Sequence, residues 1–375
     1  MARRGRGGTL TLRVSVDGTA IPAEARGAGR YVLDLVDALA RRRDVEVTVL
    51  ARRQDVTRWR GERVIGAAPA RRPLRLLWEQ AALPRTLRGL DVDVHHAPHY
   101  TMPERARLPR VVTVHDLTFF DHPEWHQRAK VRFFRRAIGV AARAADAIVC
   151  PSAATADRLV ALCSPAAPVT VIPHGVDHAR FRPDGPVPDA VAPYVLFVGT
   201  IEPRKDVATL VRAFAAVAGE HADVRLVLAG GRGWGWAPVE AALASVPHRE
   251  RIDVLGFVPD EQIPALLRGA AAVAYPSLEE GFGLPALEAL ACGAPLVTTS
   301  GTAMAEVAGD AALLIRPGDV DGLGAALARV IAGDPDRDRR RAAGLARAAR
   351  YTWDASAAAH VEVYRAACHD GDPRR

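Results

Sequence analysis

The sequence predicts an α/β protein made of two doubly wound parallel-sheet domains. Short runs of β-branched and aliphatic residues alternate with Ala-, Leu- and Arg-rich stretches almost throughout the chain. At 375 residues the chain is too long for one ordinary core. A segment rich in Pro, Gly and Asp, residues 178–193, interrupts the alternation near the middle and predicts a linker. Continuous apolar strands separated by helices indicate parallel sheets that are covered on both faces.

The first half of the chain contains apolar runs that predict strands and, between them, stretches that predict helices. The predicted strands are residues 12–16, 45–50, 92–97, 110–116, 147–152 and 169–173. The predicted helices lie near residues 28–41, 73–88, 126–144 and 153–162. This order of elements predicts an N-terminal Rossmann-like domain over residues 1–185.

The second half repeats the same alternation and predicts a second Rossmann-like domain over residues 186–352. After the first strand of this half, apolar residues recur at helical spacing, at Val207, Leu210, Val211, Phe214 and Val217. A last helical stretch, about 354–368, has no strand after it, and we expect residues 353–375 to pack back across the domain boundary. The predicted strands are residues 194–199, 224–230, 252–257, 272–277, 295–300 and 311–317.

Composition describes a soluble globular protein, with 49% hydrophobic and 25% charged residues. No uncharged apolar run reaches the roughly 18 residues of a membrane span. The basic N-terminus lacks the apolar run of a secretory signal. The four cysteines are widely spaced, which predicts reduced thiols in a cytoplasmic protein.

The net charge of +7 comes almost entirely from arginine, with clusters at 41–43, 71–72 and 132–136. Nucleic acid, an anionic membrane surface and a polyanionic substrate are the partners that such a charge attracts. High arginine usage from a GC-rich genome explains the charge equally well. The sequence contains no nucleic-acid-binding motif, so no nucleic acid partner is expected. A basic first half favours docking on anionic lipid or on an anionic acceptor.

The stretch SLEEGFGLPALEAL (277–290) follows a predicted strand and places two acids, Glu280 and Glu288, around a turn. Pro285 predicts a helix start there, because a proline at the first helical turn loses no hydrogen bond. Backbone N–H groups at a helix start favour an anion. The acids and the anion site together indicate a ligand with phosphate and hydroxyl groups. The alternative is two surface carboxylates.

After the strand at 194–199, the stretch TIEPRKD places Arg204 and Lys205 before the next helix. Cations at a helix start oppose the helix dipole unless an anion offsets them. A diphosphate would do so, with Arg204 engaging two oxygens and Lys205 acting as a point charge. The alternative is a solvated, charged turn.

His115 ends the predicted strand 110–116, where a neutral imidazole could bond a sugar hydroxyl or move a proton. Two alternatives stand beside this role. One is a histidine satisfied within the fold. The other is a metal site, because histidines are frequent in this half of the chain and imidazole is a common ligand. The histidines concerned are His95, His96, His99, His115, His122 and His126.

Three glycine- or turn-rich stretches also follow predicted strands. Gly27 and Gly29 precede a helical run and permit close approach to a phosphate or sugar. The stretch LAGGRGWGW (228–236) permits a nucleotide to lie close, or forms a flexible loop. GFVPDEQIPALL (256–267) could read a nucleobase edge or simply start a helix.

These stretches resemble the retaining glycosyltransferases of family 4, also called glycosyl transferases group 1. The resemblance rests on GTIEPRKD, LGFVPDEQIPALLRGA, PSLEEGFGLPALEALACGAPLVTT, GAGRYV and IPHGVD, and it is strongest from about residue 170 to 320. It implies the GT-B architecture, in which two Rossmann-like domains face each other across a cleft. The donor nucleotide sugar would bind mainly to the second domain and the acceptor to the first, with no metal or other cofactor.

The resemblance also implies roles for individual second-domain residues. Arg204 and Lys205 match the diphosphate clamp, Glu280 the contact to the transferred sugar, and Glu288 the contact to the ribose hydroxyls. The backbone N–H groups of Phe282, Gly283 and Leu284 match a second phosphate or sugar contact, and the backbone near Val258 matches the base-reading loop. One position departs from the family pattern, because Thr200 stands where many relatives carry Arg.

In the first domain, the resemblance matches His115 to the histidine near the anomeric carbon and Gly29 to a glycine loop over the phosphate. The implied reaction transfers a sugar, with retention, from a nucleotide diphosphate donor to a hydroxyl acceptor by a front-face route. The Glu-Pro-Arg-Lys form of the clamp favours GDP-mannose, with UDP-sugars open. The expected acceptor is a polysaccharide, glycolipid or related glycan, and the expected place is the cytoplasm, at the inner face of the cell membrane.

Other functions fit parts of the same pattern. A non-catalytic subunit would keep the clamp and bind donor without turnover. A metal-dependent hydrolase would use the first-domain histidines. A phosphorylase or sugar epimerase would share the fold, but Lys205 is the only candidate for a pyridoxal lysine.

Overall fold

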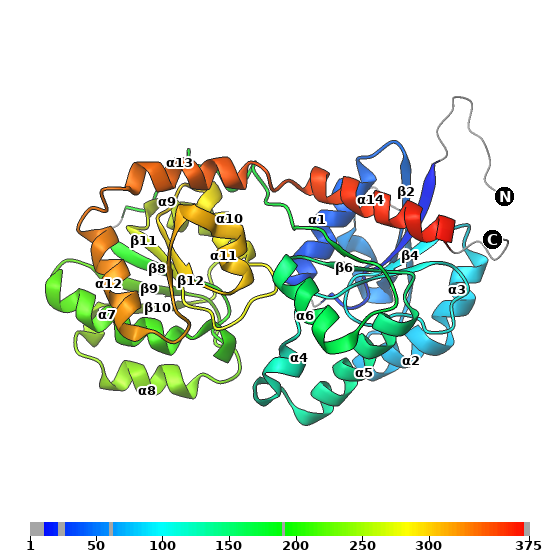
Figure 1. The fold of residues 1–375 in the computed structure, drawn as a ribbon, viewed down its shortest axis with the longest axis horizontal. Helices are drawn as coiled ribbons and strands as arrows, with labels where there is room; N and C mark the ends of the chain where they lie inside the picture. The colour runs from blue at the N-terminus through cyan, green and yellow to red at the C-terminus, as the bar shows by residue number, and fades with distance from the viewer. Residues whose placement is uncertain (1–10, 22–26, 60–62, 190–191, 371–375) are drawn as a thin grey trace. The chain divides into compact units, whose positions relative to one another are not determined.

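The computed structural model describes residues 11–21, 27–59, 63–189 and 192–370. The chain forms two compact units (Figure 1). Unit 1 holds the described residues up to Gly175 and the segment from Trp353, and unit 2 runs from Val176 to Thr352. The division therefore falls before the linker expected at 178–193, because Val176 and Phe181 are buried in the core of unit 2.

Unit 1 is built on a parallel sheet in the order β3-β2-β1-β4-β5-β6-β7. The chain crosses from one side of β1 to the other between β3 and β4, which is the reversal of a Rossmann-type sheet. Its strands are β1 (Leu12–Asp17), β2 (Val45–Arg52), β3 (Arg63–Ala68), β4 (Val94–Ala97), β5 (Arg110–Thr113), β6 (Ala147–Cys150) and β7 (Val169–Val171).

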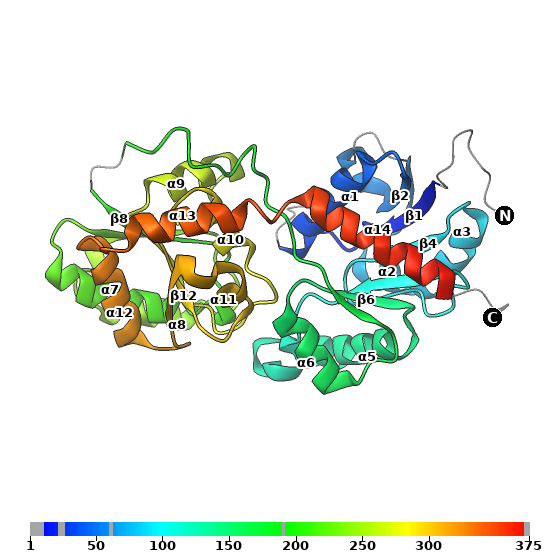
Figure 2. The ribbon, with the colours of Figure 1, turned by 45° about the horizontal axis from the view of Figure 1, so that its top comes forward.

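Helices cover the sheet of unit 1, and its core falls into separate clusters beneath them. One cluster lies under α1 and α14, which run side by side in Figures 1 and 2. The helices are α1 (Ala28–Ala40), α2 (Arg72–Ala81), α3 (Leu83–Gly89), α4 (Thr118–Asp121), α5 (Arg128–Ala144), α6 (Ala153–Cys163) and α14 (Trp353–Asp370), with short 3-10 turns η1 (Arg53–Arg58) and η2 (Pro123–Trp125).

Unit 2 is built on a parallel sheet in the order β10-β9-β8-β11-β12-β13. Here the reversal lies between β8 and β11, which pair directly, Val195 with Ala272 and Leu196 with Val273. The strands are β8 (Tyr194–Val198), β9 (Arg225–Ala229), β10 (Ile252–Gly256), β11 (Ala272–Tyr275), β12 (Leu296–Thr299) and β13 (Ala312–Ile315).

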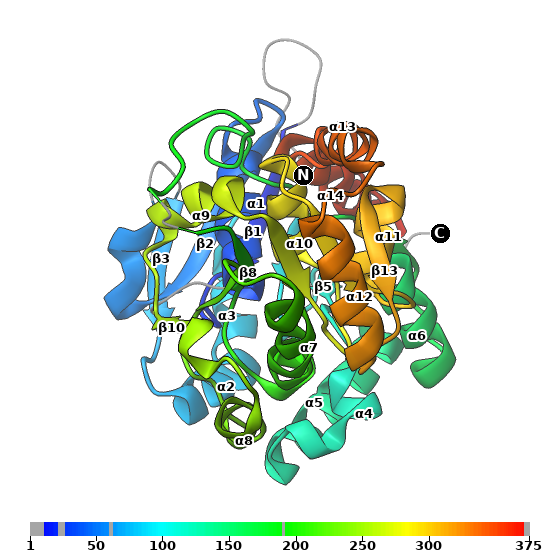
Figure 3. The ribbon, with the colours of Figure 1, turned by 90° about the vertical axis from the view of Figure 1, so that its left-hand side faces the viewer.

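Two groups of helices sandwich this sheet, as Figure 3 shows. The first group is α7 (Val207–Glu220), α8 (Ala237–Ser245) and α12 (Val320–Ile331). The second is α9 (Ile263–Gly269), α10 (Leu284–Ala291), α11 (Ala303–Ala308) and α13 (Arg337–Ala348). The predicted apolar face of α7 is buried in the core, which confirms the helical spacing read from the sequence. Short 3-10 turns precede or follow several helices: η3 (Pro203–Lys205), η4 (Arg249–Arg251), η5 (Asp260–Gln262) and η6 (Gly309–Ala311).

The two parallel sheets with alternating helices confirm the predicted fold class, but some elements differ from those expected. The strand β3 was not predicted, because it is a partly exposed edge strand interrupted by Gly66. The single helix expected at 73–88 is two helices, since Pro84 lies in the first turn of α3 and a proline there starts a new helix. The strand expected at 110–116 ends at Thr113, so His115 lies in the loop beyond it.

Helix α14 is joined to the sheet of unit 1 by a buried chain of polar side chains. The contacts are Tyr364 Oη to His96 Nδ1 (2.7 Å), His96 Nε2 to Thr113 Oγ1 (2.8 Å), Thr113 Oγ1 to Tyr31 Oη (3.0 Å) and Tyr31 Oη to His360 Nε2 (2.8 Å). This chain connects α14, β4, β5 and α1. We call it the Tyr–His chain.

The end of the Tyr–His chain fixes the direction of its hydrogen bonds. His360 Nδ1 lies 2.8 Å from the Ser356 carbonyl, which only accepts, so Nδ1 carries the proton. Neutral His360 then accepts from Tyr31, and Tyr31 accepts from Thr113. Thr113 in turn accepts from His96, whose other nitrogen accepts from Tyr364. Every polar group is satisfied only while both histidines are neutral.

We predict that the Tyr–His chain makes unit 1 sensitive to acid. Burial lowers the pKa of His360 to about 4, and it also lowers the pKa of His96 well below its usual value. As the pH falls, these histidines take up protons in the unfolded chain at a higher pH than in the folded chain. Their contribution to the free energy of unfolding should therefore be constant above pH ~7 and fall below pH ~6.5. In His360→Gln, the slope of unfolding free energy against pH between about 6 and 4.5 should drop by roughly 1.4 kcal/mol per pH unit.

Urea unfolding at a series of pH values measures this slope. His369→Gln is the control, because His369 is exposed on the same helix. An unchanged slope in His360→Gln, or an equal change in the control, would contradict the assignment.

Candidate functional site

The sequence-predicted cations and Glu280 follow the two strands that flank the reversal point of unit 2. Arg204 and Lys205 come after β8, in η3, and Glu280 comes in the loop after β11. The loops are also joined directly, because Leu278 N donates to the Arg204 carbonyl over 2.8 Å. In doubly wound sheets, ligands bind outside the carboxyl ends of strands at such a reversal.

Arg204, Lys205 and Glu280 form one ion-pair network. One Glu280 oxygen pairs with the Arg204 guanidinium, and the other pairs with Lys205 Nζ. The Lys205 and Glu280 side chains are only 6% and 8% exposed, so this pair is shielded from water. Besides the sugar contact predicted for it, Glu280 therefore holds both cations in place.

Two residues that sequence analysis did not identify complete the network. Glu202, 9% exposed, lies 2.6 Å from Arg204 Nε through Oε1. Ser277 Oγ donates to Glu280 Oε1 over 3.2 Å. In the sequence, only their positions indicate this role: Glu202 lies two residues before Arg204, and Ser277 lies three residues before Glu280. With two cations and two carboxylates, the network is formally neutral as it stands.

The electrostatics of the network keep Glu280 ionised. Burial opposes the charge, but attraction from Arg204 and then Lys205 outweighs it and lowers the pKa of Glu280 to about 2. Burial also lowers the pKa of Lys205, while attraction from Glu280 works against that shift. Arg204 is 26% exposed in its side chain and faces solvent more than Lys205 does. An incoming anion would therefore meet Arg204 first.

The start of α10 lies just beyond Glu280. Gly283 is the residue before the helix, with φ of 108°, and an added Cβ would lie 2.8 Å from Met304 Cγ. Only glycine suits both the left-handed backbone and this close contact. Phe282 is buried, with its ring 5.9 Å from that of Tyr351, while Leu284 and Pro285 form the first turn. Pro285 thus lies at the helix start, as predicted.

Glu288 lies one turn into α10 and is half-buried. Burial raises the pKa of the Tyr275 hydroxyl, and the charge of Glu288 adds to this shift. Tyr275 is the last residue of β11, so Glu288 is near the same strand end as the ion-pair network.

The glycines of LAGGRGWGW have a structural role. A Cβ at Gly230 would lie 1.8 Å from the Gly199 carbonyl oxygen, and one at Gly233 would lie 2.5 Å from that of Ile201. They let the loops after β8 and β9 run in contact, with Ile201 bridged to Arg232. Trp236 packs against the core with the Arg232 guanidinium 4.5 Å above its ring, while Trp234 is half exposed.

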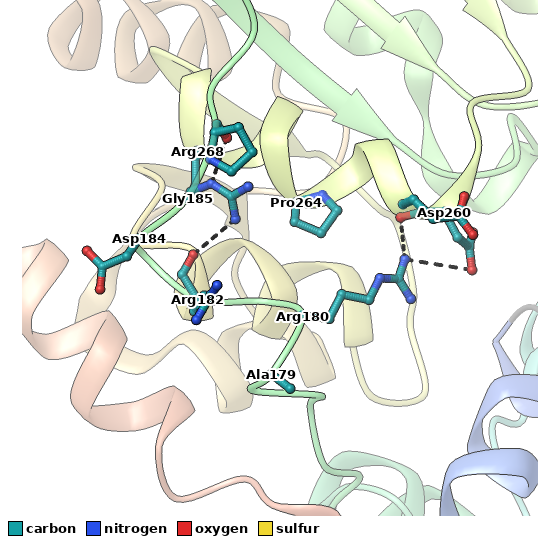
Figure 4. A pocket seen from close by; sticks show the side chains of 10 residues that line it. Ala179, Arg180, Arg182, Asp184, Gly185, Asp260, Pro264 and Arg268 are labelled. Atoms are coloured by element: carbon teal, nitrogen blue, oxygen red, sulfur yellow. Dashed lines mark hydrogen bonds and ion pairs between the residues drawn. The ribbon is translucent and has the colours of Figure 1, made fainter.

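Val258 lies in the loop between β10 and η5 and packs partly against the core. Close to this loop is a hollow of about 380 Å³ (Figure 4). Two of its arginines are held by backbone carbonyls: Arg268 Nε by Pro186 (2.9 Å) and Arg180 by Asp260 (2.5 Å). None of the sequence-predicted site residues lines it, and we do not identify it with the anion site at the reversal point.

His115 lies in unit 1, in the loop after β5, and is 8% exposed. Its Nε2 is 2.8 Å from the Pro98 carbonyl oxygen, so Nε2–H must donate and the other nitrogen is an acceptor. Burial lowers the pKa of His115, although the Pro98 bond and Asp116 oppose the shift. A neutral His115 can therefore accept a hydrogen bond from a hydroxyl through Nδ1.

Gly29 lies inside the first turn of α1 and is buried, whereas the sequence suggested a loop before the helix. Gly27 is the residue with left-handed φ, at 50°, directly before α1. Most of the stretch that leads to it, 22–26, lies outside the described residues.

The first-domain histidines have separate hydrogen-bond partners, although the rings of His99 and His115 lie 6.0 Å apart. His95 Nδ1 lies 3.0 Å from Ser15 Oγ, His96 belongs to the Tyr–His chain, and His126 Nε2 lies 3.0 Å from Thr118 Oγ1. Within the described ranges, no group of three or more His, Cys, Asp or Glu side chains is arranged to hold a metal ion. The geometry gives no support to the metal-dependent hydrolase.

Comparisons with known proteins identify the family of the chain. The family model "Glycosyl transferases group 1" matches residues 186–347, and the model "Glycosyltransferase Family 4" matches residues 25–180. O-antigen chain mannosyltransferase B of Escherichia coli is 31% identical over 371 residues, covering 90% of this chain and 96% of that protein. The chain belongs to glycosyltransferase family 4.

Solved structures share the fold of this glycosyltransferase. Sucrose-phosphate synthase of Thermosynechococcus elongatus superposes with a TM-score of 0.78 at 22% identity, covering 94% of this chain and 98% of that one. HepE of Anabaena in complex with UDP gives 0.72 at 19% identity, covering 95% and 100%. These likenesses confirm the GT-B class of fold.

Proposed function

We propose that this glycosyltransferase transfers a hexose from a nucleotide diphosphate sugar to a hydroxyl acceptor, with retention at the anomeric carbon. The observation that carries the proposal is the meeting of Arg204, Lys205 and Glu280 at the reversal point of unit 2, beside the start of α10. Positive groups there would stabilise the diphosphate as it leaves with growing negative charge. The backbone N–H groups of Phe282, Gly283 and Leu284 would add to this stabilisation.

The diphosphate of the donor would replace a carboxylate as the ion-pair partner of Arg204. The network is already neutral, so a diphosphate with two or more negative charges must draw Arg204 away from Glu202 or Glu280. Because Lys205 is the more buried cation, we expect it to stay with Glu280. One oxygen of Glu280 would then accept hydrogen bonds from hydroxyls of the transferred sugar. Glu288 would accept hydrogen bonds from the ribose hydroxyls, and the backbone near Val258 would contact the base.

We propose GDP-mannose as the donor. The Glu-Pro-Arg-Lys sequence of the clamp and the mannosyltransferase name of the Escherichia coli relative support mannose. HepE of Anabaena, whose structure contains UDP, makes a UDP-sugar the second candidate donor. It ranks second because HepE is only 19% identical to this chain. The two cations offer charge compensation that a divalent ion would otherwise supply, and on this ground we propose a metal-independent reaction. The acceptor would be a growing polysaccharide or a glycolipid.

His115 is proposed to accept a hydrogen bond from a hydroxyl of the transferred sugar through Nδ1. This follows from the tautomer that the Pro98 carbonyl fixes. A proton-donating role would require His115 to be charged, which its lowered pKa disfavours. The alternative is a subunit that binds donor without turnover. Measuring donor binding and sugar transfer on the wild-type protein separates the two, because such a subunit would bind donor but transfer nothing.

We predict that Glu288→Ala weakens donor binding. Loss of a carboxylate that bonds the ribose hydroxyls should raise the Kd for GDP about ten- to a hundredfold. Calorimetric titration with GDP, with UDP in parallel, measures the change. Glu240→Ala is the control, because Glu240 is an exposed acid of α8 in the same unit. Equal affinity in Glu288→Ala and wild-type protein would remove Glu288 from the donor site.

We predict that His115→Ala separates binding from transfer. The Kd for the nucleoside diphosphate should stay unchanged, while the rate of sugar transfer falls about a hundredfold or more. The rate is measured with a donor that carries a labelled sugar, as label moved to an acceptor or, without a known acceptor, as label released by donor hydrolysis. His369→Ala, at an exposed histidine of the same unit, is expected to behave as wild type. Full transfer by His115→Ala would show that the imidazole has no part in the reaction.

A further inference from the structure

Two exposed aromatic side chains lie at one edge of the unit 2 sheet. Trp234 is 51% exposed and Phe257 is 59% exposed, while every other described Phe, Tyr and Trp side chain is buried or partly buried. Trp234 lies in the loop after β9, and Phe257 directly follows the last residue of β10. Because these parallel strands are neighbours, both residues follow the carboxyl ends of strands, where ligands of such sheets bind. We call Trp234 and Phe257 the exposed aromatic pair.

The loop that carries Trp234 is held against the loop that carries the cations of the ion-pair network. Gly233 N donates to the Ile201 carbonyl over 2.9 Å, and a Cβ at Gly233 would lie 2.5 Å from that oxygen. On the other side of Trp234, a Cβ at Gly235 would lie 2.6 Å from Pro203 Cγ. Pro203 begins η3, the turn that contains both cations. The backbone of Trp234 is therefore fixed beside the candidate anion site.

The core of unit 2 uses Trp236 rather than Trp234. Trp236 packs against the core, with the Arg232 guanidinium 4.5 Å from the centre of its ring, and so anchors the loop. Burial of an aromatic side chain is favourable, and a half-exposed indole forgoes much of that gain. A ring that is kept in water beside an anion site indicates a ligand with a flat, weakly polar face that would cover it.

The order of the strands indicates which part of the donor would reach this ring. Along the carboxyl edge, the loop near Val258 follows β10, Trp234 follows β9, and the cations follow β8. Neighbouring strands lie about 4.8 Å apart, so β10 and β8 are about 10 Å apart, which is comparable to the length of a nucleoside diphosphate. Glu280 follows β11, beyond the cations. Trp234 therefore lies on the base side of the diphosphate, and the transferred sugar would lie on the other side.

We propose that the nucleobase of the donor stacks on the Trp234 indole and covers the exposed aromatic pair, and that this contact favours a purine. The inference rests on the proposed function, because it takes the diphosphate to bind at Arg204 and Lys205. A purine offers a larger face than a pyrimidine, so stacking would add more to the affinity for GDP than to the affinity for UDP. The backbone near Val258 would then contact the edge of a base whose face is already held.

Calorimetric titration of the full chain with GDP, UDP and inorganic pyrophosphate tests the proposal. Trp234→Leu keeps an apolar side chain but removes the flat ring. We expect this variant to raise the Kd for GDP about tenfold or more, to raise the Kd for UDP less, and to leave the Kd for pyrophosphate unchanged. Trp234→Phe retains a smaller ring, so its Kd for GDP should lie between those of the wild type and Trp234→Leu.

Tryptophan fluorescence gives a second readout, because a stacked guanine quenches the emission of an indole. Saturating GDP should quench part of the wild-type emission, and this part should be absent in Trp234→Leu. Leu314→Ala is the control, because Leu314 is exposed on β13, at the opposite edge of the same sheet. The control should bind all three ligands as the wild type does.

Three results would overturn the proposal. The first is wild-type affinity for GDP in Trp234→Leu. The second is an equal loss of affinity for GDP and for pyrophosphate, because the variant would then have displaced the cations. The third is a loss that appears with GDP-mannose but not with GDP, which would assign the indole to the sugar. All three leave the proposed function standing, whereas a wild-type protein that binds none of these ligands would contradict both.

Discussion

The buried ion pair between Lys205 and Glu280 is the interaction on which the candidate site depends. It joins the loop after β8 to the loop after β11, and these strands lie at the centre of the unit 2 sheet. Buried ion pairs give little net stability, because desolvation offsets most of the attraction. Their value here lies in position: the pair fixes a cation at the reversal point before any ligand arrives, and Arg204 shares the same carboxylate.

The sequence predicted the elements of unit 2 and three residues of this network, Arg204, Lys205 and Glu280, for a physical reason. Strands buried on both faces appear as continuous apolar runs, and the turn residues Gly283 and Pro285 mark the start of α10 clearly. The pairing within the network could not be predicted, because Glu280 was assigned to sugar contact and Glu202 received no role. Which acid meets which cation depends on loop geometry that residue spacing does not encode.

Unit 1 was predicted less completely. β3 has no clear apolar pattern, since it is an edge strand that is partly exposed. The orientation of His115 depends on a backbone carbonyl, that of Pro98, which no side-chain pattern reveals. Likewise, five of the six histidines that suggested a metal site are hydrogen-bonded within the fold, and His96 among them belongs to the Tyr–His chain that secures α14. Each of these features arises from contacts between residues far apart in the sequence.

The most direct test of the central claim is calorimetric titration of the wild-type protein with GDP, GMP, UDP and UMP in the presence of a chelator. If Arg204 and Lys205 hold a diphosphate, one nucleoside diphosphate should bind without metal and more tightly than its monophosphate, by about tenfold or more. Equal affinity for diphosphate and monophosphate, or binding that appears only when a divalent metal is added, would contradict the account.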